Sequence, residues 1–252
     1  MTKLTRESNN QSPGDWQYLN NVGTLWSESA DDTVEKLDAF TKFVSRQSLT
    51  KFLARAEVFQ KQLEINGSII EVGVHRGTSF MTWAHLSSIF EPVNYLRKII
   101  GFDTFEGFVG ISDKDSTGKS EHLKLGGFNA GKASREELLD AIELYDSNRL
   151  MGHIEKCELI RGDASLEIPN YLKLNPHLLV SLLHLDADLY DPTAAALKYF
   201  LPRMPKGAVI LFDELNLDSF PGETLALLES MDVNSKAIKR FPFATSMSYL
   251  TV

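Results

Sequence analysis

Four acidic side chains, two after each of two apolar segments, have the types and spacing needed to hold a metal ion. Asp186 and Asp188 follow one segment, and Asp213 and Glu214 follow the other. Four carboxylates crowded together repel one another unless a cation or a hydrogen-bond network offsets their charge. Oxygen ligands of this kind select Mg²⁺, Mn²⁺ or Ca²⁺ rather than zinc. The alternative is that Asp188 and Asp191 only cap the helix that follows.

Histidines near these acids could serve as general bases, but no motif selects one of them. His75, His122 and His153 fall in or near expected loops. His184 lies within an apolar segment, where we expect a buried histidine with satisfied hydrogen bonds rather than a base.

A glycine-containing turn at residues 71–79 has the features of a small-molecule site. Gly73 lets the backbone approach a ligand closely, and the helix expected after it offers free N–H groups to a carboxylate. Glu71 would then face the amino group of the same amino-acid moiety. His75 stands where the dinucleotide fingerprint G-x-G-x-x-G has its second glycine, which leaves less room for a diphosphate. A generic strand–helix turn is the alternative.

Two more acidic residues follow apolar segments and complete the pattern of a nucleoside site. Asp103 ends the second such segment, where a carboxylate usually binds ribose hydroxyls in folds of this type. Asp163 follows the third segment, where it could accept from the amine of an adenine ring. For both residues, capping of a turn or a helix is the alternative.

The elements that must position these residues are five apolar strands separated by helices. This alternation predicts an α/β, doubly wound fold with a parallel sheet covered on both faces. In such sheets ligands bind beyond the carboxyl ends of the strands, where all the residues above are expected. The predicted strands are 68–73, 98–103, 157–161, 178–185 and 208–212, and two strand-like pieces at 236–241 and 246–252 predict a closing antiparallel hairpin.

Helical periodicity predicts the remaining elements. We expect an N-terminal extension of two helices over residues 32–46 and 49–63, after an arm at residues 1–15 whose following aromatics pack onto their own domain or a neighbouring subunit. Residues 104–133 carry little periodicity, and a loop of this length is typical of an active-site lid. The aromatic residues that follow the arm are Trp16, Tyr18 and Trp26. Two of the other expected helices span 78–90 and 219–231. A third begins at Ser134 with a capping box to Glu137, and a fourth is begun by Asp191-Pro192 and runs through Leu201.

Composition excludes several classes of function. The net charge of −8 and the pI near 5.3 provide no global attraction to nucleic acid or anionic lipid. No apolar run approaches a membrane span and no signal-peptide core is evident, so we expect a cytoplasmic protein without a membrane partner. The single cysteine, Cys157, is expected to be an inert buried thiol.

The chain resembles the macrocin O-methyltransferase family, whose members methylate sugar hydroxyls during antibiotic biosynthesis. The residues that carry the resemblance lie in four segments, of which L-D-x-D-L-Y-x-x-T is the most specific. The likeness covers roughly residues 65–252. The four segments are 70–77, 102–107, 185–193 and 201–213.

The resemblance implies a Rossmann-like class I methyltransferase sheet of seven strands with the last one antiparallel. Residues 1–65 would form the N-terminal extension and residues 66–252 the methyltransferase domain. The implied cofactor is S-adenosylmethionine, and the implied acceptor is a small glycosylated molecule bound by a homo-oligomer. The predicted positions for the methyl donor are Glu71, Gly73, Gly77, Ser79, Asp103 and Asp163, with the adjoining Thr104 and Ala164.

The resemblance also implies a Mg²⁺ ion on three carboxylates, at the positions Asp186, Asp213 and Glu214. Asp186 would accept the proton of the sugar hydroxyl. Relatives usually have Asp-Asp where this chain has Asp213-Glu214, so the metal could shift, bind more weakly or contact Glu214 through a water molecule.

Three other interpretations compete with a methyltransferase. Asp186-Ala187-Asp188 is a D-x-D sequence that could hold the metal of a nucleotide sugar in a glycosyltransferase, although the 71–77 turn has no role in that scheme. A non-catalytic cofactor-binding protein on the same fold is the second. A nicotinamide-dependent dehydrogenase is disfavoured because the second glycine is missing.

Overall fold

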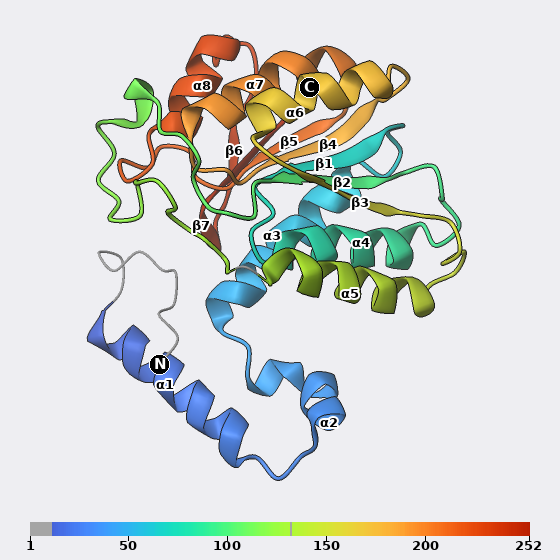
Figure 1. The fold of residues 1–252 in the computed structure, drawn as a ribbon, viewed down its shortest axis with the longest axis vertical. Coiled ribbons are helices and arrows are strands. Elements are labelled where there is room, and N and C mark those ends of the chain that lie inside the picture. The colour runs from blue at the N-terminus through green and yellow to red at the C-terminus, as the bar shows by residue number, and fades with distance from the viewer. Residues whose placement is uncertain (1–11, 132) are drawn as a thin grey trace. The chain divides into compact units, whose positions relative to one another are not determined.

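Short, buried, apolar segments form the central sheet of this computed structural model, which describes residues 12–131 and 133–252 (Figure 1). Strands β1, β4 and β5 are buried along their whole length, as expected of strands covered on both faces. The strands are β1 Ser68–Val72, β2 Ile99–Asp103, β3 Cys157–Arg161, β4 Val180–Leu185, β5 Val209–Phe212, β6 Lys239–Phe241 and β7 Ala244–Thr251.

The seven strands follow the order β3-β2-β1-β4-β5-β7-β6. Strands β1 to β5 are mutually parallel, while β7 runs antiparallel to both β5 and β6. The predicted doubly wound sheet with an antiparallel end is therefore confirmed. The chain leaves β1 in one direction and returns to its other side at β4, which makes the β1–β4 pair the switch point where such sheets bind ligands.

Helices cover the two faces of the sheet in separate groups (Figure 1). One apolar core joins the sheet to α3, α4 and α5, and the other joins it to α6, α7 and α8. The helices are α3 Arg46–Lys61, α4 Thr78–Phe90, α5 Ser134–Ser147, α6 Ala164–Leu174, α7 Tyr190–Phe200 with the 3₁₀ turn η4 Leu201–Arg203, and α8 Gly222–Ser230. No helix in the described ranges is both long and apolar enough to cross a membrane.

The N-terminal region differs from its prediction. The chain divides into compact units at Lys51/Phe52, within α3. In the first unit, helix α1 spans Pro13–Glu28, so it begins inside the predicted arm, with Ser12 as its N-cap. The rest of the arm lies outside the described residues. The predicted helix 32–46 consists of α2, Thr33–Asp38, and the 3₁₀ turn η2, Phe40–Lys42. Trp26 packs edge-on against Phe43 at 4.9 Å, inside its own unit.

Helix α5 begins at Ser134 as predicted, but two predicted helix caps are wrong. Helix α5 has Ala133 as its N-cap, so Ser134 is already helical and makes no capping box. Helix α7 begins at Tyr190 after the N-cap Leu189, so Asp191-Pro192 lies inside the first turn and neither Asp188 nor Asp191 caps the helix. No bounds were predicted for helix α6, which the sequence indicated only through the capping alternative for Asp163.

The insertion at 104–133 is bonded to the domain by its backbone. It contains the 3₁₀ turn η3, Asp113–Asp115, and the N–H groups of Lys119 and Ser120 donate to the carbonyls of Asp218 and Ser219. The Asp115 carboxylate is 1% exposed and accepts the first N–H of α7, from Tyr190, at 3.0 Å. Residues 104–131 thus form an insertion that is bonded to the carboxyl side of the sheet, and its role as a lid stays a prediction.

Cys157 provides a test of the core. The thiol is 6% exposed, and burial raises its pKa to about 12. At about pH 8 only about one thiol in ten thousand is then ionised, so we expect Ellman's reagent to leave the native protein unmodified and to label Cys157 after denaturation. Rapid labelling under native conditions, measured at 412 nm, would contradict this packing.

Candidate active site

The carboxyl ends of the strands are joined by a continuous set of backbone hydrogen bonds. The N–H of Gly73 donates to Phe102, that of Asp186 to Val72, and that of Asp213 to Leu185, all at 2.9–3.0 Å. Adjacent strand tips are therefore fixed to one another. This brings the turn after β1 and the acids after β4 and β5 into one site, as the sequence predicted.

Gly73 makes the closest of these approaches. Its φ is +93°, and a Cβ built on it would lie 2.0 Å from the carbonyl oxygen of Asp186. Only glycine adopts this conformation without strain and leaves room for the facing backbone. Gly77, with φ +79°, is the N-cap of α4 and offers no side chain to the first-turn N–H groups. Those groups remain available to an anionic ligand.

The two carboxylates predicted to bind the donor are held in different ways. Glu71 is fully buried, and one of its oxygens accepts from the Ser79 hydroxyl at 2.6 Å. Asp103 accepts from the N–H groups of Val74 and His75, each at 2.7 Å, and from Phe105 at 2.6 Å. Asp103 thus ties β2 to the β1 turn. Each carboxylate oxygen has two lone pairs, so these bonds leave capacity for a ribose hydroxyl.

The other residues predicted to bind the methyl donor lie in a turn and at the start of a helix. Asp163 is the N-cap of α6 and accepts from the backbone and hydroxyl of Ser165, as the capping alternative predicted. Ala164 is the first residue of that helix. The Thr104 hydroxyl donates to the carbonyl of Gly107 within the turn after β2. All three lie at the carboxyl ends of β2 and β3.

Two of the three residues predicted to hold a metal lie close together, and their role as metal ligands stays a prediction. Ligand atoms of His184, Asp186 and Asp213 lie within 4.8 Å of one another. Glu214 does not belong to this group; its N–H donates to the buried carboxylate of Glu223 at 3.1 Å. The structure therefore puts a histidine beside the two aspartates where the sequence predicted a third carboxylate.

His184 is buried, as predicted, but it is not a satisfied core histidine. Its Nδ1 lies 3.4 Å from a Glu71 oxygen and its Nε2 3.9 Å from an Asp186 oxygen. Neither nitrogen has a hydrogen-bond partner in the part of the chain that is described. The edge of Trp83 packs against the ring at 5.5 Å. The imidazole thus lies between the predicted donor site and the predicted metal site.

The sequence indicated an alternative role for Asp188 as a helix cap and did not identify Glu223. Asp188 is half-buried in the left-handed conformation at φ +62°. Burial, and then the nearby Glu214 carboxylate, raise the pKa of Asp188 well above its ordinary value. Burial likewise raises the pKa of Glu223, which is fully buried on α8. No sequence motif marked Glu223, although an acid in the first turn of a helix after Asp213-Glu214 was a usable signal.

Arg55 was also missed. It lies on α3, is 5% exposed, and places Nη2 3.8 Å from Asp186 and 3.9 Å from Asp213. A contact between an early helix and two strand tips carries no local sequence signal.

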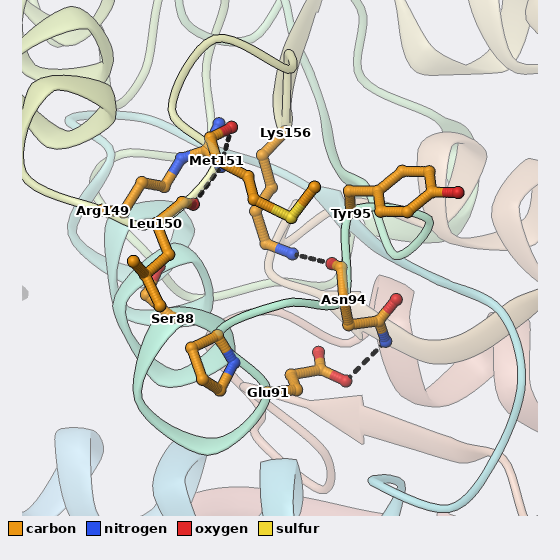
Figure 2. A pocket seen from close by; sticks show the side chains of 9 residues that line it. Ser88, Glu91, Asn94, Tyr95, Arg149, Leu150, Met151 and Lys156 are labelled. Atoms are coloured by element: carbon orange, nitrogen blue, oxygen red, sulfur yellow. Dashed lines mark hydrogen bonds between the residues drawn. The ribbon is translucent and has the colours of Figure 1, made fainter.

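A hollow at the other end of the sheet offers no comparable chemistry (Figure 2). Lys156 precedes β3 and donates to the backbone carbonyls of Asn94 and Arg97, while Glu91 accepts from the amide of Asn94. Arg149 donates to Asp146 and to carbonyls of its own loop. These charged groups are hydrogen-bonded to their neighbours, so we assign the hollow no role in ligand binding or catalysis.

Comparison with known proteins identifies the family. The family model for macrocin O-methyltransferase (TylF) matches residues 37–223. The structure of the calicheamicin methyltransferase CalS11 superposes with a TM-score of 0.92 at 30% identity, covering 96% of this chain and 94% of CalS11. The chain belongs to the macrocin O-methyltransferase family.

Other comparisons agree with this membership. The apo structure of CalS11, described as a TDP-rhamnose 3′-O-methyltransferase, superposes with a TM-score of 0.82 at 28% identity over 96% of both chains. The O-methyltransferase NovP shares the fold, with a TM-score of 0.59 at 14% identity over 80% of this chain and 78% of NovP. No match was found among curated protein sequences.

Membership in the macrocin O-methyltransferase family confirms the resemblance and the fold class read from the sequence. The protein is an O-methyltransferase. The glycosyltransferase interpretation of Asp186-Ala187-Asp188 loses its support, as do the dehydrogenase and the non-catalytic binding protein.

Replacing Gly73 by alanine tests the joint between the strand tips. We expect Gly73→Ala to lower the free energy of unfolding by roughly 2–5 kcal/mol, because the new Cβ meets the Asp186 carbonyl and φ is positive. Gly110→Ala is the control: nothing lies within 4 Å of the position its new Cβ would take, so a change within about 0.5 kcal/mol is expected. Equal stability of both variants in urea titrations would refute the contact.

Glu223 gives a pH-dependent prediction for protein in a metal-chelating buffer. Its raised pKa means that the folded state favours the protonated acid, so this contribution to stability is present below the ordinary value of 4.5 and is lost as the pH rises toward the folded pKa. Glu223→Gln keeps an oxygen that accepts from the Glu214 N–H and removes the negative charge at position 223. We expect it to be more stable than wild type at neutral pH by roughly 1–3 kcal/mol.

The difference between Glu223→Gln and wild type should shrink as the pH falls toward 4.5. Glu229→Gln is the matched control, because Glu229 lies on the same helix, is exposed and pairs with Lys114. We expect Glu229→Gln to change stability by less than about 1 kcal/mol. A pH-independent effect of Glu223→Gln, measured by thermal unfolding, would contradict the assignment.

Proposed function

We propose that this protein methylates a sugar hydroxyl of a small natural product, with S-adenosylmethionine as methyl donor and a divalent ion, Mg²⁺, at the acidic cluster. The observation that carries the proposal is the contact of Gly73 with the backbone of Asp186. It puts the predicted donor turn directly beside the predicted metal carboxylates. The sugar acceptor is supported by the relation to CalS11, which acts on TDP-rhamnose and belongs to calicheamicin biosynthesis.

The donor site is proposed at the carboxyl ends of β1, β2 and β3. The open turn at Gly73 and the uncapped N-terminus of α4 fit the carboxylate of an amino acid. Asp103 is positioned for ribose hydroxyls and Asp163 for an adenine amine. The remaining proposed positions are Glu71, Gly77, Ser79, Thr104 and Ala164.

The metal site is proposed at Asp186, Asp213 and Glu214. The fit is supported by the proximity of the first two, whose oxygens lie within 4.8 Å of each other and of His184. Carboxylate ligands suit Mg²⁺ or Mn²⁺, whereas a histidine ligand shifts preference toward transition metals. Calorimetric titrations of the protein with Mg²⁺, Mn²⁺ and Zn²⁺ in parallel therefore test whether Glu214 or His184 is the third ligand.

Catalysis requires alignment of the acceptor and removal of its proton. When bound, the donor supplies an electrophilic methyl group and the cation stabilises the deprotonated hydroxyl. A hydroxyl with a pKa near ~15.7 costs about 12 kcal/mol to ionise at pH 7, which a lone carboxylate supplies poorly. The strand tips hold Asp186 beside the Gly73 turn, where it accepts the proton. Rigid placement of the reacting groups by the sheet contributes roughly 7–11 kcal/mol in well-aligned reactions.

Two properties of the whole protein belong to the same proposal. We place the enzyme in the cytoplasm and expect a homo-oligomer. The second is supported by the apolar side chains that the N-terminal unit exposes, including Leu25, Val34, Leu37 and Phe40.

Calorimetric titration with S-adenosylmethionine, with and without Mg²⁺, tests the donor and the metal separately. We expect donor binding in both conditions, saturable Mg²⁺ binding, and loss of turnover on a TDP-sugar after chelation. Asp186→Ala should lower kcat by at least about 100-fold while donor binding persists. Undiminished turnover after rigorous chelation, or full activity of Asp186→Ala, would refute metal assistance; absence of donor binding would refute the cofactor.

A further inference from the structure

A buried cation lies against the proposed metal ligands. The guanidinium of Arg55 is 3.8 Å from an oxygen of Asp186 and 3.9 Å from an oxygen of Asp213. Both distances exceed a hydrogen bond, so the interaction is mainly electrostatic. Arginine keeps its charge at every accessible pH. The positive charge is therefore a permanent part of the site.

Helix α3 fixes this charge in place. Ala54, Val58 and Phe59, on the same helix, are fully buried in the core that also contains β1 and α4. The Arg55 side chain is 6% exposed, and its Nε has no hydrogen-bond partner among the residues that the structure describes. A side chain this enclosed cannot exchange the carboxylates for solvent without displacement of α3.

The energetic reason for such a cation is the cost of burying like charges. Asp213 is 2% exposed, and Asp186 is close enough to share a ligand with it. Two neighbouring buried carboxylates repel each other unless a positive charge compensates them. A cation that compensates them also repels a divalent ion that binds to the same oxygens.

We propose that Arg55 is a positioning residue that holds the Asp186 and Asp213 side chains in place in the metal-free enzyme by compensating their negative charge, and thereby weakens divalent-ion binding. This inference rests on the metal site of the proposed function. Its consequence is an enzyme that is folded and pre-formed without the ion, and that binds and releases the ion readily.

Arg55→Met tests the inference, because methionine keeps much of the apolar length without the charge. We expect Arg55→Met to bind Mg²⁺ about tenfold more tightly than wild type in calorimetric titrations, equivalent to about 1.4 kcal/mol. Its melting temperature in EDTA should fall, and the rise in melting temperature on adding Mg²⁺ should be larger than in wild type.

Lys61→Met is the matched control. It removes the same charge from the same helix, but Lys61 is on the surface and pairs with Glu57 at 3.0 Å. Its Mg²⁺ affinity and metal-dependent stabilisation should equal those of wild type. Equal or weaker Mg²⁺ binding by folded Arg55→Met, or the same gain in Lys61→Met, would overturn the inference.

A double-mutant cycle of Arg55→Met and Asp213→Asn, measured in EDTA, separates this inference from the proposed metal site. Asp213→Asn should lower the melting temperature in the wild-type background, because it removes one of the two carboxylates that attract Arg55. It should raise the melting temperature in the Arg55→Met background, because there it removes a carboxylate that repels Asp186. Additive effects would overturn the inference even if Mg²⁺ binds. If wild type does not bind Mg²⁺, the proposed metal fails, and this cycle still decides the role of Arg55.

If Arg55→Met does not fold, Arg55→Lys takes its place. Lysine keeps the charge on a narrower head group, so we expect near-wild-type Mg²⁺ affinity and stability in EDTA. A large gain in Mg²⁺ affinity for Arg55→Lys would show that shape rather than charge matters and would overturn the inference.

Discussion

The contact between the backbone of Gly73 and that of Asp186 is the constraint on which the rest of the site depends. It lies where β1 meets β4, the switch point between the two halves of the parallel part of the sheet. Because the contact is between backbones, it does not depend on the side chain at position 186. The register of β1, β4 and β5 then determines where Asp186 and Asp213 lie relative to the turn.

Around this joint the protein buries more charge than stability alone would favour. Glu71, Glu223 and Asp213 are almost without solvent, and Arg55 and His184 are enclosed with them. Burying ionisable groups costs free energy unless they are paired, and the contact between His184 and Glu71 is longer than a hydrogen bond normally is. Sites that depart from the rules of stable packing in this way are typically functional.

The sequence predicted the sheet well because its strands are continuous apolar runs that need no distant information. Helix α4 was predicted at its observed limits for the same reason, since Thr78–Phe90 is apolar and follows a glycine turn. The bounds of helix α6 were missed because Pro169 lies inside it, and proline ordinarily interrupts a helix. Helix α1 is polar and buries no residue, although Ser12 and Asp15 form a capping box that could have marked its start.

The site was predictable only where strand ends determine it. Asp186 and Asp213 meet because adjacent parallel strands end together. His184 and Glu223 depend on which side of the sheet faces which helix, and Arg55 on how α3 packs, so their roles follow from tertiary contacts. Helix capping was the alternative considered for Asp188, whereas here the helix begins without a side-chain cap.

The anchoring of the 104–133 insertion has a consequence for how substrate enters. Asp115 holds the first amide of α7, directly after the L-D-x-D segment, and its carboxylate has almost no contact with water. If the whole insertion swung outward as a flap, this helix end would lose its acceptor and a buried acid would lose its donor. Any movement of the insertion that keeps this bond has to bend on either side of Asp115, within the glycine-rich stretches that flank it.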